Sequence, residues 1–263
     1  MAEVGGGAGG PTLQVGAVVG AAIGGYARAF ASLLPMVVVT RVPDVLGKFF
    51  GGQGAAITWA LSLGSFLLAC VVTIPGCLIA DAALQKQPPL SLGEALERSG
   101  PALWRFIKWT LAAMPAFVGI ALVGVGGAVG VNFARQVGNA VGLAVSALVA
   151  AAAAILLLRL LTLWSLLGPI VAFEPAKEVS RPLFRSAQLV RPQFWSVVGS
   201  WAALWVFVVP GIVLVYVSAT AHTPQATAAY WLGVACGVLS APIVWVGTVA
   251  IYRGLRGAGG AGA

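Results

Sequence analysis

The chain has 263 residues, of which 60% are hydrophobic and only 8% are charged, and its mean hydropathy is +0.98. Soluble domains carry roughly 25% charged residues, so this composition excludes a soluble globular protein and indicates an integral membrane protein. The net charge of +8 is therefore interpreted against a membrane surface, and it gives no support to nucleic-acid binding.

Apolar windows long enough to cross the roughly 30 Å hydrocarbon core recur along the chain. We predict an all-α, polytopic transmembrane helical bundle, because backbone exposed to lipid must satisfy its hydrogen bonds within each segment. The predicted spans, six in all, cover about residues 29–48, 55–80, 105–131, 139–173, 194–220 and 226–252. The pattern leaves open whether residues 12–28 are interfacial or form an additional span. We predict a single membrane domain at residues 11–256. It is flanked by flexible tails at residues 1–10 and 257–263.

Prolines and glycines punctuate these spans. Each span contains at least one proline, which removes a backbone donor and predicts a kink. These prolines are Pro35, Pro43, Pro75, Pro115, Pro169, Pro210 and Pro242. Glycines at four-residue spacing allow helix backbones to approach closely, and we expect packing within the chain rather than a dimer face. They are Gly16, Gly20 and Gly24, then Gly126 and Gly130, then Gly138 and Gly142.

Two linkers predict short amphipathic helices that lie at the membrane surface. Before the third span, Ser91 and Glu94 form the capping-box pattern that begins a helix. Before the fifth span, apolar residues from Leu183 to Val190 share one face and basic residues share the other. Both linkers contain an Arg-Ser pair and lead into an aromatic span entrance. With a fainter copy near the start of the chain, they predict a threefold internal repeat of one surface helix and two spans.

Basic residues gather on one side of the predicted membrane. That side has Arg28, Lys86, Arg98, Arg105, Lys108, Lys177, Arg181, Arg185, Arg191, Arg253 and Arg256, and the other side has Arg41, Lys48 and Arg135. By the positive-inside rule, both termini are predicted to be cytoplasmic. We expect a multi-pass protein of the bacterial cytoplasmic (inner) membrane.

The basic faces of the linkers are the predicted binding surfaces. They are expected to bind membrane lipids through anionic headgroups, or to dock a cytosolic or membrane protein partner, and the two roles are compatible. The candidate residues are Arg98, Arg105, Lys177, Arg181, Arg185 and Arg191.

The segment WSLLGPIVAFEPAKEVSRPLFRSAQLVRPQFW contains a span that ends in proline and an acid, then a helix with Arg-Ser, then an aromatic span entrance. It resembles six-span bacterial membrane proteins related to the membrane domain attached to some glycerophosphodiester phosphodiesterases. The likeness is best from Arg159 to Trp205, and elsewhere it concerns mainly the span count. The resemblance implies the membrane fold, whereas the phosphodiesterase activity belongs to a separate soluble domain for which this chain has no room.

Arg159 lies inside the fourth apolar window. An arginine within a membrane normally faces a bundle interior or a watery cavity, so we expect Arg159 to face the interior as an intramembrane polar candidate. The fourth window is too long for one ordinary crossing. A span that ends near Leu158 would instead let Arg159 snorkel to the surface.

Groups for catalysis are scarce, because the chain has seven acids and one histidine, His222, which is predicted in a short external turn. No spacing matches a metal site, the cysteines Cys70, Cys77 and Cys236 lie in apolar windows, and we predict no cofactor. The leading hypothesis is a non-enzymatic accessory or scaffold subunit with basic cytoplasmic surface helices. The alternative is a transporter or channel-like protein that binds an anionic or lipid-like substrate near Arg159.

Overall fold

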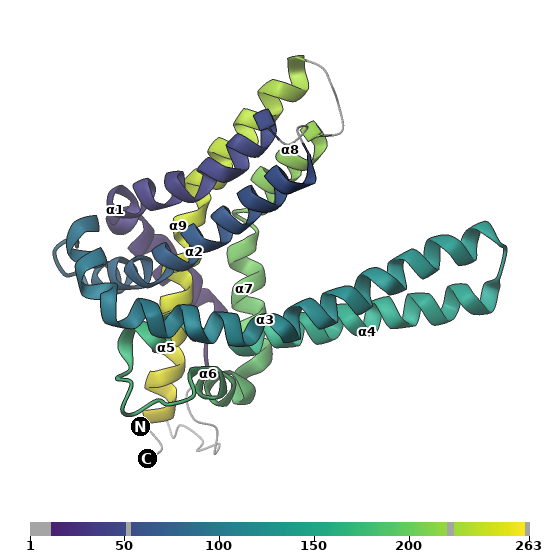
Figure 1. Cartoon of the computed structure of the whole chain (residues 1–263). Coiled ribbons are helices and arrows are strands. Elements are labelled where there is room, and N and C mark those ends of the chain that lie inside the picture. The colour runs from purple at the N-terminus through teal and green to yellow at the C-terminus, as the bar shows by residue number, and fades with distance from the viewer. Residues whose placement is uncertain (1–11, 51–53, 220–223, 261–263) are drawn as a thin grey trace, which may run out of the picture.

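The computed structural model describes residues 12–50, 54–219 and 224–260, and within these residues the chain is helical and has no strand (Figure 1). In chain order the helices are α1 (Val15–Phe50), α2 (Ala55–Leu84), α3 (Leu92–Gln136), α4 (Ala140–Trp164), α5 (Leu167–Phe173), α6 (Pro182–Val190), the 3₁₀ turn η2 (Arg191–Gln193), α7 (Phe194–Trp205), α8 (Val209–Ala219) and α9 (Pro224–Gly260). The predicted N-terminal tail and His222 lie outside the described residues. The described part of the predicted C-terminal tail is helical, because α9 continues to Gly260.

The all-α class is confirmed, and the described residues contain five helices long and apolar enough to cross a membrane. A sixth crossing is counted if two helical segments, Pro182–Trp205 and Val209–Ser218, form one span with a bend of 56°. The chain is therefore compatible with a multi-pass membrane protein of five to six crossings. The predicted count of six and the threefold repeat stay predictions.

Both interruptions within the predicted spans fall four residues before a proline. α4 ends at Trp164, and Pro169 can offer no N–H to the carbonyl of Ser165, which its ring also crowds. Pro210 has the same relation to Val206, at the break between α7 and α8. The fourth and fifth predicted spans are therefore interrupted helices. Other prolines remain inside continuous helices, namely Pro35, Pro43, Pro75, Pro101, Pro115 and Pro242.

Of the two predicted surface helices, only the second is a separate helix in the structure. At the first, the Oγ of Ser91 accepts a hydrogen bond from the Glu94 N–H at 3.3 Å, and the Glu94 carboxylate accepts one from the Ser91 N–H at 3.0 Å. The capping box is confirmed, and the helix that it begins continues into the span without a break, so a surface helix there stays a prediction. α6 is a separate helix at the second linker. Residues 15–28 form no helix of their own, because α1 runs unbroken to Phe50.

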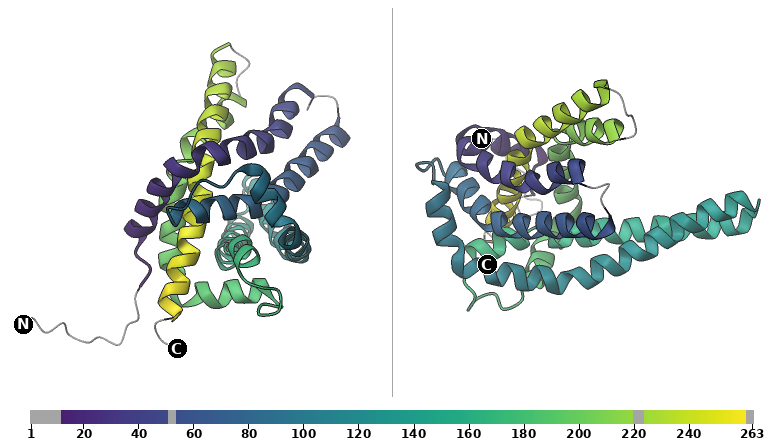
Figure 2. Two further views of the ribbon diagram at one scale, coloured as in Figure 1. Left: turned by 90° about the vertical axis from the view of Figure 1, so that its left-hand side faces the viewer. Right: turned by 45° about the horizontal axis from the view of Figure 1, so that its top comes forward.

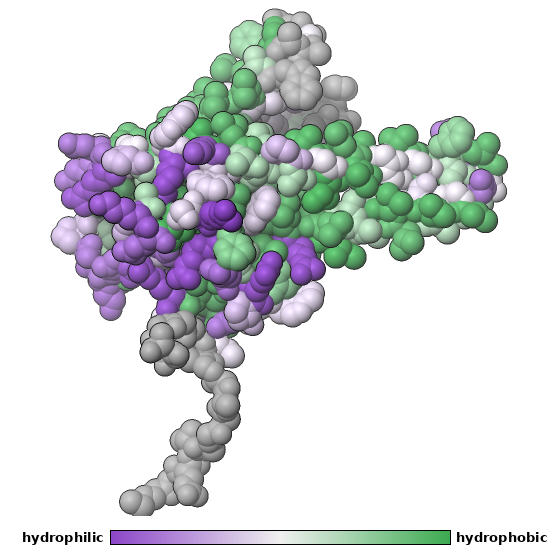
Figure 3. Space-filling model, turned by 60° about the horizontal axis from the view of Figure 1, so that its bottom comes forward, coloured by the Kyte–Doolittle hydropathy of each residue, from purple (hydrophilic) through white to green (hydrophobic). Residues whose placement is uncertain are grey.

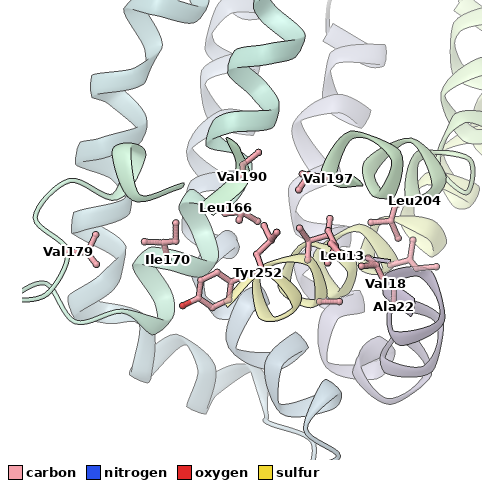
Figure 4. Close-up of a cluster of buried hydrophobic side chains, with 14 residues drawn as sticks. Leu13, Val18, Ala22, Leu166, Ile170, Val179, Val190, Val197, Leu204 and Tyr252 are labelled. Atoms are coloured by element: carbon pink, nitrogen blue, oxygen red, sulfur yellow. The ribbon is translucent and has the colours of Figure 1, made fainter. Parts of the chain in front are cut away.

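α9 is the central helix of a body in which it packs against α1, α2, α7 and α8 (Figures 1 and 2). One buried cluster joins α9 to α1, α5, α6 and α7 (Figure 4), where Leu166, Ile170 and Ile251 are fully enclosed. A second cluster joins α9 to α1, α2 and the start of α3. The body is thus assembled from segments far apart in the sequence.

α3 and α4 form a long hairpin that projects from this body (Figure 1). Its turn places Gly138 at φ +66°, a left-handed conformation that favours glycine, and the Asn139 side chain caps α4 through the Gly142 N–H at 2.9 Å. A methyl group on Gly130 would meet the Ser146 hydroxyl, so this glycine packs within the chain as predicted. The prediction is wrong for the glycines that face open space, which are Gly16, Gly20, Gly24, Gly126 and Gly138.

Candidate functional site at the charged end

Polar side chains gather at one end of the body, whereas the hairpin surface is largely apolar up to its tip (Figure 3). We call this region the charged end, and it is defined by Asp81, Lys86, Arg98, Arg105, Glu174, Arg181, Arg185, Arg253 and Arg256. It lies where α2 and α5 end, where α6 begins and where α9 finishes.

Glu174, directly after α5, is the centre of the site, and only 5% of its surface is exposed. The Tyr252 hydroxyl donates a hydrogen bond to its Oε1 at 2.9 Å. The Arg185 Nε lies 3.5 Å from its Oε2. A buried carboxylate is costly unless it is paired and hydrogen-bonded, and these two partners meet both requirements. They also fasten α6 and α9 to the end of α5.

Two further arginines complete this network. The Arg105 guanidinium, from α3, donates to the backbone carbonyl of Glu174 at 2.9 Å. The Arg256 guanidinium donates to the Tyr252 hydroxyl at 3.3 Å. The network therefore connects α3, α5, α6 and α9 through one acidic residue.

A second carboxylate, Asp81 near the end of α2, has an equivalent position. The Arg253 Nε lies 2.6 Å from its Oδ1, and the Gln85 amide donates to its other oxygen at 2.7 Å. Arg253 follows Tyr252 in α9, so adjacent residues of one helix hold the two acids that follow Pro75 and Pro169. Pro75 and Asp81 thus correspond to Pro169 and Glu174, and the threefold repeat stays a prediction.

An open cavity of about 430 Å³ lies beside Glu174. Its lining includes the guanidinium-bearing residues Arg181, Arg185 and Arg256, with Glu178 and the exposed ring of Phe184. Guanidinium groups present several N–H donors in a plane that fits carboxylate and phosphate oxygens. The cavity is therefore suited to an anionic group, with an apolar contact at Phe184.

The structure brings together half of the predicted candidates. Arg105 and Arg185 converge on Glu174, and Arg181 lines the same cavity. The others, Arg98, Lys177 and Arg191, are exposed at the charged end and do not line this cavity. Sequence reasoning missed the hub formed by Glu174, Tyr252 and Arg256, and the pair Asp81–Arg253. The available signal was an acid at the end of an apolar helix, which requires a cationic or hydrogen-bonding partner.

Arg159 does not occupy the predicted place. Its side chain is exposed on α4, so the prediction that it faces the interior of this chain is wrong. The Ser186 hydroxyl of α6 donates to the Leu163 carbonyl at 2.6 Å, and Leu163 is only about 6 Å further along the helix than Arg159. α4 continues past Leu158 to Trp164, and the apolar segment from Ala140 to Phe173 counts as one candidate span, so snorkelling of Arg159 stays a prediction.

Comparisons of the chain with protein-family models, with curated proteins and with solved structures find no match. The resemblance to the membrane domain of glycerophosphodiester phosphodiesterases stays a prediction. Among the residues that the structure describes, no group of three or more histidine, cysteine or acidic side chains could hold a metal ion.

Proposed function

We propose that the protein is a non-enzymatic accessory or scaffold subunit of the bacterial cytoplasmic membrane, with both termini in the cytoplasm. Its charged end is the surface that docks an anionic region of a partner protein. The arginines outside the cavity contact the anionic headgroups around it.

One observation carries this proposal. The buried and partly buried acids of the charged end are engaged in contacts within the chain, Glu174 with Tyr252 and Arg185 and Asp81 with Arg253, whereas Glu178 is exposed. The lining of the open cavity has three arginines, Arg181, Arg185 and Arg256, and two acids, Glu174 and Glu178. A general acid or base needs access to a substrate, whereas an exposed cationic cavity favours binding of an anionic group.

Aromatic and basic side chains support a membrane boundary at each end of the body. Trp104 and Trp195 are 71% and 77% exposed beside the charged end. At the opposite end the Lys48 ammonium lies 5.0 Å from the centre of the Tyr230 ring. About 34 Å of helix separates Tyr230 from Arg253 in α9, close to the thickness of a hydrocarbon core of roughly 30 Å. Interfacial Trp, Tyr and Lys are the usual anchors at such boundaries.

Cysteine labelling in intact cells tests the orientation. Gln87, at the charged end, and Gln225, at the start of α9, are exposed and are replaced by cysteine one at a time in a background without native cysteines. An impermeant reagent should label position 225 from outside and position 87 only after permeabilisation. Labelling of both positions from the same side would contradict the topology.

Photo-crosslinking tests the docking role. A photoreactive amino acid at Gln188, which lines the cavity, should give a discrete protein adduct, and the same residue at Gln225 should not. The adduct should weaken when Arg181 and Arg256 are both replaced by glutamine, because the cavity then loses two cations. Lipid adducts alone at Gln188, or a protein adduct that is unchanged in the double variant, would contradict docking.

The alternative is a transporter that binds its substrate near Arg159, and it was motivated by an interior position of this residue, which the structure does not show. The exposed Arg159 side chain on α4 does not belong to the linings of four cavities of about 290–510 Å³ in the described part of the chain.

A further inference from the structure

α6 lies at the root of the hairpin, where α4 meets the body, and it also lines the cavity beside Glu174 (Figures 1 and 2). Two adjacent residues of this helix contact different neighbours. The Arg185 Nε lies 3.5 Å from the Glu174 carboxylate, directly after α5. The Ser186 hydroxyl donates to the Leu163 carbonyl, near the end of α4, at 2.6 Å. α6 is therefore fastened on both sides of the break between α4 and α5.

The break between α4 and α5 can act as a hinge. Pro169 supplies no backbone N–H, so the ladder of hydrogen bonds that stiffens a helix is interrupted here. Val190 of α6 belongs to the same buried cluster as Leu166, which lies within the break (Figure 4). With its contacts to Leu163 before the break and Glu174 after it, α6 is a splint of about 14 Å across the hinge.

The two polar fastenings of α6 differ in strength. The Arg185 side chain is 41% exposed, so water weakens its ion pair with Glu174, and an anion in the cavity can compete for the guanidinium. Ser186 is fully buried, and its hydroxyl would lose hydrogen bonding altogether without its acceptor. An anion that binds Arg185 therefore breaks the ion pair and leaves the bond to Leu163 intact. Glu174 then keeps the hydrogen bond from Tyr252.

The α3 side of the hairpin root is anchored without α6. The Arg105 guanidinium donates to the Glu174 backbone carbonyl at 2.9 Å, and Phe106 packs in one buried cluster with Leu167 of α5. A displacement of α6 consequently acts on α4 while the root of α3 stays in place. Because α3 and α4 pack against each other along the hairpin, the pair turns about this fixed root.

We propose that occupation of the cavity beside Glu174 sets the angle of the hairpin through α6. This regulation rests on the docking function proposed above. An acidic segment of the partner pairs with Arg185, α6 moves away from Glu174, and the hydrogen bond from Ser186 to Leu163 carries α4 along. The coupling is reciprocal, so a partner that holds the hairpin in the turned position also raises the affinity of the cavity for an acidic segment.

The test measures the hairpin angle of the whole protein in nanodiscs of neutral lipid. Spin labels at Val141 of α4 and Leu232 of α9, both exposed, report it by double electron–electron resonance in a background without native cysteines. α4 runs about 35 Å from Trp164 to Val141, so a turn of about 10° moves the label at Val141 by about 6 Å. A hexaglutamate peptide should shift the distance by an amount of this order, and hexaglutamine should not.

Two variants test the path of the coupling. Arg185→Gln removes the ion pair, so its distance without peptide should already match that of the wild type with hexaglutamate. Ser186→Ala keeps the cavity lining but removes the connection to Leu163. Fluorescence anisotropy should therefore show unchanged binding of hexaglutamate to this variant, while the distance shift is largely lost. Arg135→Gln, at an exposed residue of the hairpin tip, is the control and should change neither binding nor distance.

The outcomes separate this regulation from the docking function. Binding of hexaglutamate without a distance shift would overturn the coupling and leave docking in place, and so would an Arg185→Gln distance equal to that of the unbound wild type. A full distance shift in Ser186→Ala would overturn the path through α6 and α4. Absence of hexaglutamate binding to the wild type would contradict docking and, with it, control of the hairpin by a partner.

Discussion

The α9-centred body and the α3–α4 hairpin are both apolar, but they differ in the share of their residues that is buried. In the most apolar windows of α2 and α9, 44% of the residues are buried, whereas the figure is 6% for α3 and for α4. Hydrophobicity alone does not pack helices together in lipid, because the acyl chains are as apolar as the side chains. The difference therefore comes from specific contacts.

Those contacts are polar cross-links and close backbone approaches. The body has Glu174 with Tyr252, Asp81 with Arg253, and Tyr26, whose hydroxyl donates to the Leu239 carbonyl at 2.8 Å. The hairpin has contacts mainly between its own two helices, at Gly127 and Gly130. It follows that the body is held together from several directions, whereas the hairpin presents most of its surface to lipid or to a partner.

The largest effect is expected at Glu174. Glu174→Ala removes the carboxylate that accepts from the buried Tyr252 hydroxyl and pairs with the Arg185 guanidinium, and should destabilise the body by about 3 kcal/mol. Denaturant unfolding in mixed micelles, followed by Trp fluorescence, measures this change. Glu178→Ala, at an exposed residue of the same cavity, is the matched control and should change stability by less than about 0.5 kcal/mol. Equal effects of the two substitutions would show that Glu174 does not hold the body together.

The next largest effect is expected in the hairpin, at Gly127. A methyl group there would lie 2.8 Å from the Ala150 backbone nitrogen, so Gly127→Ala must push α3 and α4 apart. Overpacking of this kind costs about 1–3 kcal/mol. The distance between spin labels at Gly119 and Ala154, both exposed, should increase in the variant. An unchanged distance would mean that the close approach at Gly127 does not set the spacing of the hairpin.

A smaller effect is expected for the pair Asp81–Arg253, whose side chains are 17% and 38% exposed. A double-mutant cycle with Asp81→Asn and Arg253→Gln should give a coupling energy of about 1 kcal/mol or less, because water screens the pair. The coupling should decrease as salt is raised. A coupling energy as large as the effect of Glu174→Ala would mean that the partly exposed Asp81 carboxylate stabilises the body as much as the buried Glu174 carboxylate.

The parts of this fold that depend on neighbouring residues could be predicted from the sequence, and those that depend on distant ones could not. The capping box of Ser91 and Glu94 is local, and so is the proline that interrupts α4. Tyr252 reaches Glu174 across 78 positions of the chain, and no periodicity reports such a pair. Whether Arg159 is covered depends on which distant helices pack against α4, such as α6, whose Ser186 hydroxyl donates to the Leu163 carbonyl, and no local pattern reports this.

Arg41 illustrates the same limit for a charged residue. The charge distribution places it at the far boundary, because it lies near the end of the first predicted span. Its depth became evident only from its neighbours on α8 and α9, which are more than 160 positions away. Charge counting places a residue on one side of a membrane, but only packing shows whether it faces a cavity.

The smallest effect on the stability of the isolated chain is expected at Gly126, the neighbour of Gly127. A methyl group there meets nothing within 4 Å, so Gly126→Ala should leave the spacing of α3 and α4 unchanged and stabilise the helix by up to about 1 kcal/mol. If a partner helix packs against this exposed face, as a scaffold subunit requires, the same methyl group would occupy space that the partner uses. We therefore expect the Gly126→Ala variant to unfold in detergent no earlier than the wild type. A photoreactive residue at Val129, which is also exposed on α3, should nevertheless give fewer crosslinks to a membrane partner in this variant. If both proteins give only lipid adducts, in equal amounts, then the hairpin contacts lipid alone. Its low burial would then not be due to a missing partner.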